Sequence, residues 1–212
     1  MPRATVKMQI RSYGKLLGDL RAIDASTAKA IKATVKDIKA RAPGWIATAV
    51  TGVYNIKKSE VTPASSSAKG PQRKAASVLV TGETIDSIAI TYKGRLLTPT
   101  HFGMKPKQRP RSTKDAHGRT VKRAKPYAVT AEIFKGQRKG LGADAFLGTN
   151  KGTGEIPFQR MGAARTPIKA IKTTSVPQML TQDQVADAIQ GKLNSGLEER
   201  FNHHMSRQLG TK

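Results

Sequence analysis

The chain contains no cysteine, which excludes disulfide bridges and thiolate metal sites and suits a reducing compartment. Only 5% of its 212 residues are aromatic and 37% hydrophobic, so we expect a modest core that draws some stability from neighbouring subunits. The longest uncharged run, residues 42–56, is too short for a membrane span, which needs about 18 or more apolar residues. The first residues carry scattered charge rather than a secretory signal. We therefore expect a soluble protein.

Acidic residues are also scarce. Fourteen Asp and Glu stand against thirty-eight Lys and Arg, which gives a net charge of +24. These positive charges repel one another and so destabilise an isolated compact monomer. The excess is better explained if the charge faces a polyanion, most commonly nucleic acid. One interpretation is therefore a nucleic-acid-binding protein of the ribosomal or nucleoid type, which binds independently of base sequence.

No motif in the sequence indicates an enzyme or a cofactor site. Residues 140–142 (Gly-Leu-Gly) lack the strand, helix and downstream acid of a dinucleotide fingerprint. His203 and His204 are adjacent, so on a helix they point about 100° apart and cannot chelate one ion together. His101 and His117 stand in predicted loops without an evident acid partner. The carboxylates are scattered, with no pair suited to acid and base roles. We predict no catalytic residue, no cofactor and no metal site.

The N-terminal quarter of the chain predicts helix. Residues 31–42 place an apolar stripe at helical spacing, and lysines on a second stripe are most simply a solvated face. Pro43 should break this helix or begin a new one. A denser apolar face follows at residues 45–54. Asn55 should end the helix as a left-handed cap.

The middle of the chain predicts a linker and then short strands. Residues 62–74 are rich in Pro, Ala, Ser, Gly and Lys, which is typical of a linker. Residues 76–80 and 85–92 predict strands around the turn at 81–82, and residues 127–134 alternate apolar and polar side chains. Two further short strands are predicted at 145–147 and 156–158. The gaps are too short for crossover helices, so we expect a small antiparallel sheet.

The C-terminal helix has the clearest predicted start. Thr181 followed three positions later by Gln184 predicts a capping box, and Leu180 can pack on Val185. Apolar residues then recur every four positions, a stripe that drifts about 40° per step on an ideal helix. One straight partner cannot cover that stripe, so its later part should meet a second subunit. The predicted interface residues are Leu197, Phe201, Met205 and Leu209.

A basic loop spans residues 103–125 and contains a single acid, Asp115. Its prolines and glycines should prevent regular structure, and alone it should be a mobile arm, because it buries too little apolar surface to offset its ordering entropy. It has no aromatic residue for base stacking and no recognition helix, which leaves sequence-blind, salt-sensitive phosphate contact. The predicted DNA-binding residues are Lys105, Lys107, Arg109, Arg111, Lys114, Arg119, Lys122, Arg123 and Lys125. The alternatives are a solvated loop, or one neutralised by acidic partner subunits.

Several local motifs also occur in a distinctive order. Residues 53–61 (Val-Tyr-Asn-Ile-Lys-Lys-Ser-Glu-Val) match a Tyr-Gly-Ile-Lys-Lys-x-Asp-Val pattern, with Asn55 in the glycine place. The most specific piece is 175–180 (Ser-Val-Pro-Gln-Met-Leu), before a helix that contains Arg200 and Phe201. Smaller pieces lie at 80–82, 102–103, 144–147, 158–160 and 165–168. Together they resemble the minor tail protein Z family of long-tailed phages, also described as tail completion proteins. The linker and the long basic loop depart from the compact family pattern.

This resemblance implies a structural virion protein. Such proteins complete the head-proximal end of the tail, where the head joins and the end of the packaged DNA lies. The implied partners are the tail terminator, the tape measure protein and phage DNA, in a homo-oligomeric ring for which tail symmetry suggests six copies. Assembly would take place in the host cytoplasm. The expected fold is a single α+β domain over residues 1–212, with N-terminal helices packed on a small antiparallel sheet, an extended basic loop and a long C-terminal helix.

Overall fold

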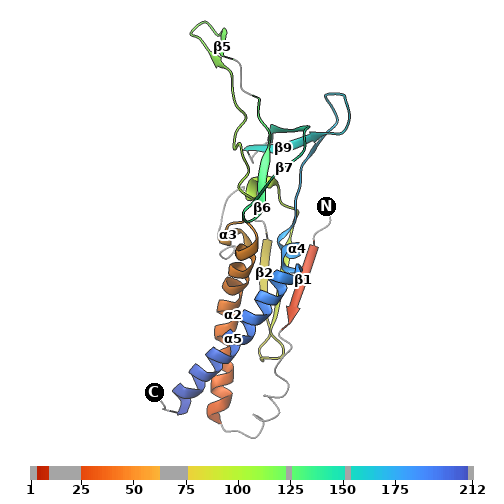
Figure 1. Ribbon diagram of the computed structural model, residues 1–212. Helices are drawn as coiled ribbons and strands as arrows, with labels where there is room; N and C mark the ends of the chain where they lie inside the picture. The colour runs from red at the N-terminus through yellow and green to blue at the C-terminus, as the bar shows by residue number, and fades with distance from the viewer. Residues whose placement is uncertain (1–3, 10–24, 63–75, 123–125, 151–153, 210–212) are drawn as a thin grey trace.

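Two long helices lie side by side in the lower part of the molecule as drawn in Figure 1. They are α2 (Ala25–Val53) and α5 (Asp183–Leu209), which run antiparallel and pack against a three-stranded sheet. Smaller sheets and a projecting hairpin occupy one end, so the expected α+β class is confirmed. The computed structural model describes residues 4–9, 25–62, 76–122, 126–150 and 154–209. All but the first residue of the predicted linker at 62–74 lies outside these ranges.

Helix α2 continues without interruption through Pro43, so the predicted break is wrong. A proline inside a helix costs about 3 kcal/mol, because it removes one backbone hydrogen bond and crowds the preceding turn. The apolar face stays in phase across it, with Ile38 and Ala42 before the proline and Ile46 and Val50 after it, all fully buried. Burying each large aliphatic side chain contributes roughly 1.5–3 kcal/mol, so together they outweigh the proline.

The end of α2 passes directly into strand pairing. Tyr54 forms an antiparallel bridge with Phe134, and their rings stack at a centroid distance of 4.8 Å. The backbone N–H of Asn55 donates to the carbonyl of Ile133 at 2.9 Å. No described residue other than glycine has a positive φ, so the predicted left-handed cap at Asn55 is wrong. The Lys135 N–H donates in turn to the Val53 carbonyl at 3.0 Å, so pairing with the strand satisfies the end of the helix without a left-handed cap.

The main sheet contains β1 (Ala4–Gln9), β2 (Ala76–Thr81) and β3 (Ala89–Gly94) in the order β1-β3-β2, all antiparallel. The strand predicted at 76–80 is confirmed, but the next begins at residue 89 rather than 85. The hydroxyl of Ser87 accepts the backbone N–H groups of both Glu83 and Thr84, at 3.0 and 2.9 Å. This local side-chain bonding competes with strand pairing and keeps the intervening residues in a turn.

The end of the molecule where α2 finishes is built from short hairpins. Strands β6 (Thr130–Phe134) and β7 (Gln137–Gly140) form one antiparallel pair. Strands β8 (Ala145–Asn150), β9 (Gly154–Arg160) and β10 (Ile168–Ala170) form a second sheet in the order β10-β9-β8. The strands predicted at 145–147 and 156–158 are therefore confirmed, and the one predicted at 127–134 begins only at residue 130. A small separate core supports this end, composed of Met104, Val129, Ala145 and Leu147.

The start of the C-terminal helix differs from the prediction. A capping box is present, but Ser175 and Gln178 form it at the start of the short helix α4 (Val176–Leu180). The Ser175 hydroxyl accepts the Gln178 N–H at 3.4 Å, and the Gln178 amide oxygen accepts the Ser175 N–H at 2.9 Å. Thr181 instead follows α4 and donates its hydroxyl to the Gln178 carbonyl at 2.9 Å. Both Ser/Thr-x-x-Gln patterns fit a capping box, but Thr181 has helical backbone angles (φ −86°, ψ −5°) because it ends α4, whereas Ser175 has the extended backbone of an N-cap residue (φ −95°, ψ 161°).

Candidate nucleic-acid interface

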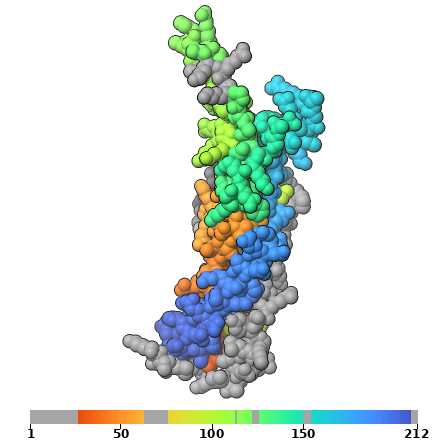
Figure 2. Space-filling model, viewed as in Figure 1, coloured from red at the N-terminus to blue at the C-terminus, as the bar shows by residue number. Residues whose placement is uncertain are grey.

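The centre of the basic loop forms a hairpin from β4 (Thr113–Lys114) and β5 (Thr120–Lys122), which projects from the end of the molecule (Figures 1 and 2). The prediction that this segment lacks regular structure is therefore wrong for its centre. Asp115 explains the turn, because its carboxylate accepts the backbone N–H groups of His117 at 3.0 Å and Arg119 at 2.8 Å. The single acid of the loop is thus engaged with backbone.

The described cations of the loop are exposed, and two of them, Lys107 and Arg111, also line a cavity. Lys105, Lys107, Arg109, Arg111, Lys114 and Arg119 are all exposed. Within the described part of the chain, none of these six side chains forms an ion pair. Lys122 lies in β5, but its side chain is outside what the structure describes, as are Arg123 and Lys125 altogether. Exposed cations that form no ion pair, on the hairpin and on the segment that leads to it, are suited to contact with phosphates.

The base of the loop is held by backbone bonds. Lys105 and Thr130 exchange two N–H to carbonyl hydrogen bonds, both 2.8 Å long. Arg138 donates to the Gly103 carbonyl at 3.0 Å and pairs with Glu132 at 3.1 Å. The loop therefore leaves the body in a defined direction. Arg138 was not among the predicted residues, because only the β6–β7 pairing brings it to the base of the loop.

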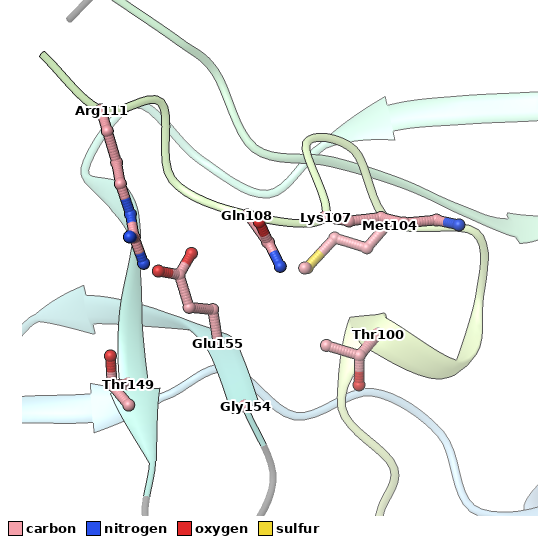
Figure 3. A pocket seen from close by; sticks show the side chains of 8 residues that line it. All are labelled: Thr100, Met104, Lys107, Gln108, Arg111, Thr149, Gly154 and Glu155. Atoms are coloured by element: carbon pink, nitrogen blue, oxygen red, sulfur yellow. The ribbon is translucent and has the colours of Figure 1, made fainter. Parts of the chain in front are cut away.

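A cavity of about 500 Å³ opens beside this base (Figure 3). It is lined by Thr100, Met104, Lys107, Gln108, Arg111, Thr149, Gly154 and Glu155. The Glu155 carboxylate accepts the backbone N–H of Arg109, and in Figure 3 its side chain and that of Arg111 point into the same space. A carboxylate at this position repels phosphate, so the exposed hairpin suits a polyanion better than the cavity does.

The predicted interface residues on α5 have different environments. Leu197 is 1% exposed inside the protomer's own core, so it has no surface left for a second subunit and its assignment is wrong. Phe201 and Met205 are half-buried along α5. Leu209 ends the helix, and its side chain is outside the described part. An intersubunit role for the last three remains a prediction.

Two of the four histidines contact acidic side chains and connect helices. His101 contacts the Glu60 carboxylate and so joins the 3-10 helix η1 (Pro99–His101) to α3 (Lys58–Val61). The expectation that His101 has no acid partner is therefore wrong. His204 lies 3.2 Å from the Asp37 carboxylate, between α5 and α2.

Acidic and histidine side chains do not gather elsewhere in the described ranges, where no cluster of three or more residues could hold a metal ion. Nor does any described helix have the length and apolarity to cross a membrane. Among the described residues, the basic loop is the strongest candidate for a binding site. Its cations are exposed, and its one acid, Asp115, accepts backbone N–H groups. Comparison with known proteins found no matching family model, no matching curated protein and no matching solved structure.

Proposed function

We propose that this chain is a non-enzymatic structural protein of a phage virion, which completes the head-proximal end of the tail and contacts phage DNA there. The ordered motifs that resemble the minor tail protein Z family support the tail assignment. The observation that carries the DNA contact is the basic loop, whose projecting β4–β5 hairpin and preceding segment present six exposed cations that form no ion pair among the described residues.

The physical basis of that contact is counterion release. Each cation that neutralises a phosphate frees a condensed counterion, and each such contact steepens the salt dependence of binding by about 0.9 in log units. Six described cations are available, and the Asp115 carboxylate does not compete for them because backbone N–H groups hold it. The hairpin presents no aromatic ring and no helix to a groove, so binding would be indifferent to base sequence.

In this proposal the protein forms a homo-oligomeric ring, with six copies expected from tail symmetry. Its neighbours would be the tail terminator and the tape measure protein, and it would reach the virion after assembly in the host cytoplasm. The half-buried Phe201 and Met205 offer apolar surface for contact between subunits. A ring would also place many basic hairpins around one duplex, which would multiply weak contacts.

A second candidate is a sequence-independent nucleic-acid-binding protein of the ribosomal or nucleoid type. The net charge of +24 favours it, because that charge extends well beyond the basic loop. The two candidates differ in where the protein accumulates. A ribosomal or nucleoid protein copurifies with host nucleic acid, whereas a tail protein remains with virions after nuclease treatment and gradient purification.

Quantitative mass spectrometry of purified virions and of separated tails tests the proposal. We expect the chain in both fractions, at a constant ratio to the tail terminator that corresponds to one ring per tail. A control fraction of tail-less heads should lack it. Absence from nuclease-treated virions, together with recovery on host ribosomes or nucleoid, would reject the tail assignment in favour of the second candidate.

A further inference from the structure

The hairpin formed by β9 and β10 (residues 159–170) carries a second set of cations, outside every site that the sequence predicts. Every residue from 159 to 169 is exposed. No acidic residue occurs between positions 156 and 182. Three exposed cations belong to this hairpin: Arg160, Arg165 and Lys169. Its local charge is therefore entirely positive.

This β9–β10 hairpin projects from the same end of the molecule as the basic loop. The two are separate projections in Figure 2, on either side of the end that carries β6 and β7 (Figures 1 and 2). Strand β9 also connects to the basic loop, because Glu155 near its start accepts the backbone N–H of Arg109. A single scaffold thus holds both sets of cations.

Local packing orders the hairpin. The backbone N–H of Met161 donates to the Pro167 carbonyl at 3.0 Å, which closes its turn region. At the base, the rings of Phe146 and Phe158 stack at 6.1 Å, and the Arg160 guanidinium lies 5.7 Å from the centre of the Phe146 ring. Cations held on an ordered scaffold lose less conformational entropy on binding than cations on a free chain.

We propose that the β9–β10 hairpin is a second phosphate-binding element, which contacts the same DNA duplex as the basic loop. The inference rests on the proposed function for the identity of the polyanion. Arg160 and Lys169 point to opposite faces of the hairpin, because they sit in adjacent cross-strand pairs. One duplex can therefore meet Arg165 near the turn and only one of these two residues. The hairpin thus contributes about two phosphate contacts.

A salt titration with matched variants tests this element. The hairpin variant replaces its three cations: Arg160→Ser, Arg165→Ser and Lys169→Ser. The control removes three positive charges from an exposed stripe near the start of α2, at the other end of the molecule from the hairpin: Lys29→Ser, Lys32→Ser and Lys36→Ser. The full chain is titrated with mixed-sequence duplex DNA at several salt concentrations. The slope of log affinity against log salt should flatten by about two units in the hairpin variant and stay near the parent value in the control.

Single substitutions sharpen the test. Arg165→Ser should flatten the slope by about one unit, and Arg165→Lys should restore it, because the contact requires charge rather than a particular shape. Of Arg160→Ser and Lys169→Ser, only one should change the slope. Circular dichroism confirms that each variant is folded.

The outcomes separate the inference from the proposed function. If the hairpin variant matches its control while basic-loop substitutions flatten the slope, the hairpin inference is overturned and the DNA contact of the basic loop stands. If the parent shows no salt-dependent binding to duplex DNA, the DNA contact in the proposed function fails, and the inference fails with it. If the hairpin variant binds DNA as the parent does but is missing from tails, the hairpin contacts a protein partner instead, which also overturns the inference.

Discussion

Gly196 on α5 allows the two long helices to approach closely at Trp45 of α2. A Cβ added at Gly196 would lie 2.4 Å from Cη2 and 2.5 Å from Cζ3 of the indole. Carbon atoms in favourable contact are about 3.5–4.0 Å apart, so the ring or the helix must move by about 1 Å or more. Lys192 lies 6.0 Å from the ring centre and packs beside the same indole. The helix pair is therefore fitted to a residue without a side chain.

The expected result of Gly196→Ala follows from two opposing effects. Alanine in a helix interior gains about 1 kcal/mol over glycine. Overpacking a well-fitted contact costs about 1–3 kcal/mol, so the net change should be a destabilisation of up to about 2 kcal/mol. Gly191→Ala is the matched control on the same helix, because no atom lies within 4 Å of its added Cβ. It should stabilise the protein by about 1 kcal/mol.

Urea unfolding followed by circular dichroism measures both changes. Trp45 is the only tryptophan in the chain, so its fluorescence independently reports displacement of the ring in Gly196→Ala. In a Trp45→Leu background the clash is absent, and Gly196→Ala should become stabilising, which a double-mutant cycle quantifies. Equal stabilisation by Gly191→Ala and Gly196→Ala in the parent would refute the packing argument.

Three further predictions concern the basic loop, the helix caps and the core. Removing four cations of the basic loop should flatten the salt dependence of DNA binding, by about 0.9 for each phosphate that is no longer neutralised, and leave thermal stability nearly unchanged. The substitutions are Arg109→Ser, Arg111→Ser, Lys122→Ser and Arg123→Ser. Ser175→Ala should cost about 1 kcal/mol in urea unfolding, whereas Thr181→Ala should cost less than about 0.5, and the reverse order would contradict the observed capping box. The buried hydroxyl of Tyr92 has no partner among the described residues, so Tyr92→Phe should stabilise the protein by about 1 kcal/mol at pH 7. Burial raises the pKa of Tyr92 above its ordinary 10.0, so this tyrosine ionises in the unfolded chain before it ionises in the folded one. The parent therefore loses stability as pH rises past 10. Urea unfolding at pH 7 and at pH 10.5 should show that the stability gained by Tyr92→Phe is larger at pH 10.5.

Periodicity along the chain was enough to predict the elements that bury one continuous face. The stripe of α5 from Val185 to Leu193 is buried as expected, and the alternation at 127–134 corresponds to β6, with Val129 buried just before the strand and Ala131 buried within it. Composition likewise indicated the exposed cations of the basic loop, because hydration of charge is a local property. These features depend on residues close together in the sequence, so local patterns determine them.

Tertiary structure decided the features that depend on distant partners. Whether Pro43 breaks α2 depends on the cores on both sides of it, and Asn55 needs no cap because the distant residue Ile133 accepts its N–H. Two equivalent capping patterns were distinguished only by the backbone at each one, which is extended at Ser175 and helical at Thr181, where α4 ends. The β9–β10 hairpin and the basic loop lie at the same end of the molecule, where Glu155 of β9 accepts the backbone N–H of Arg109. The sequence alone determined which segments carry positive charge, while contacts between distant segments decided which of them lie at the same end of the molecule.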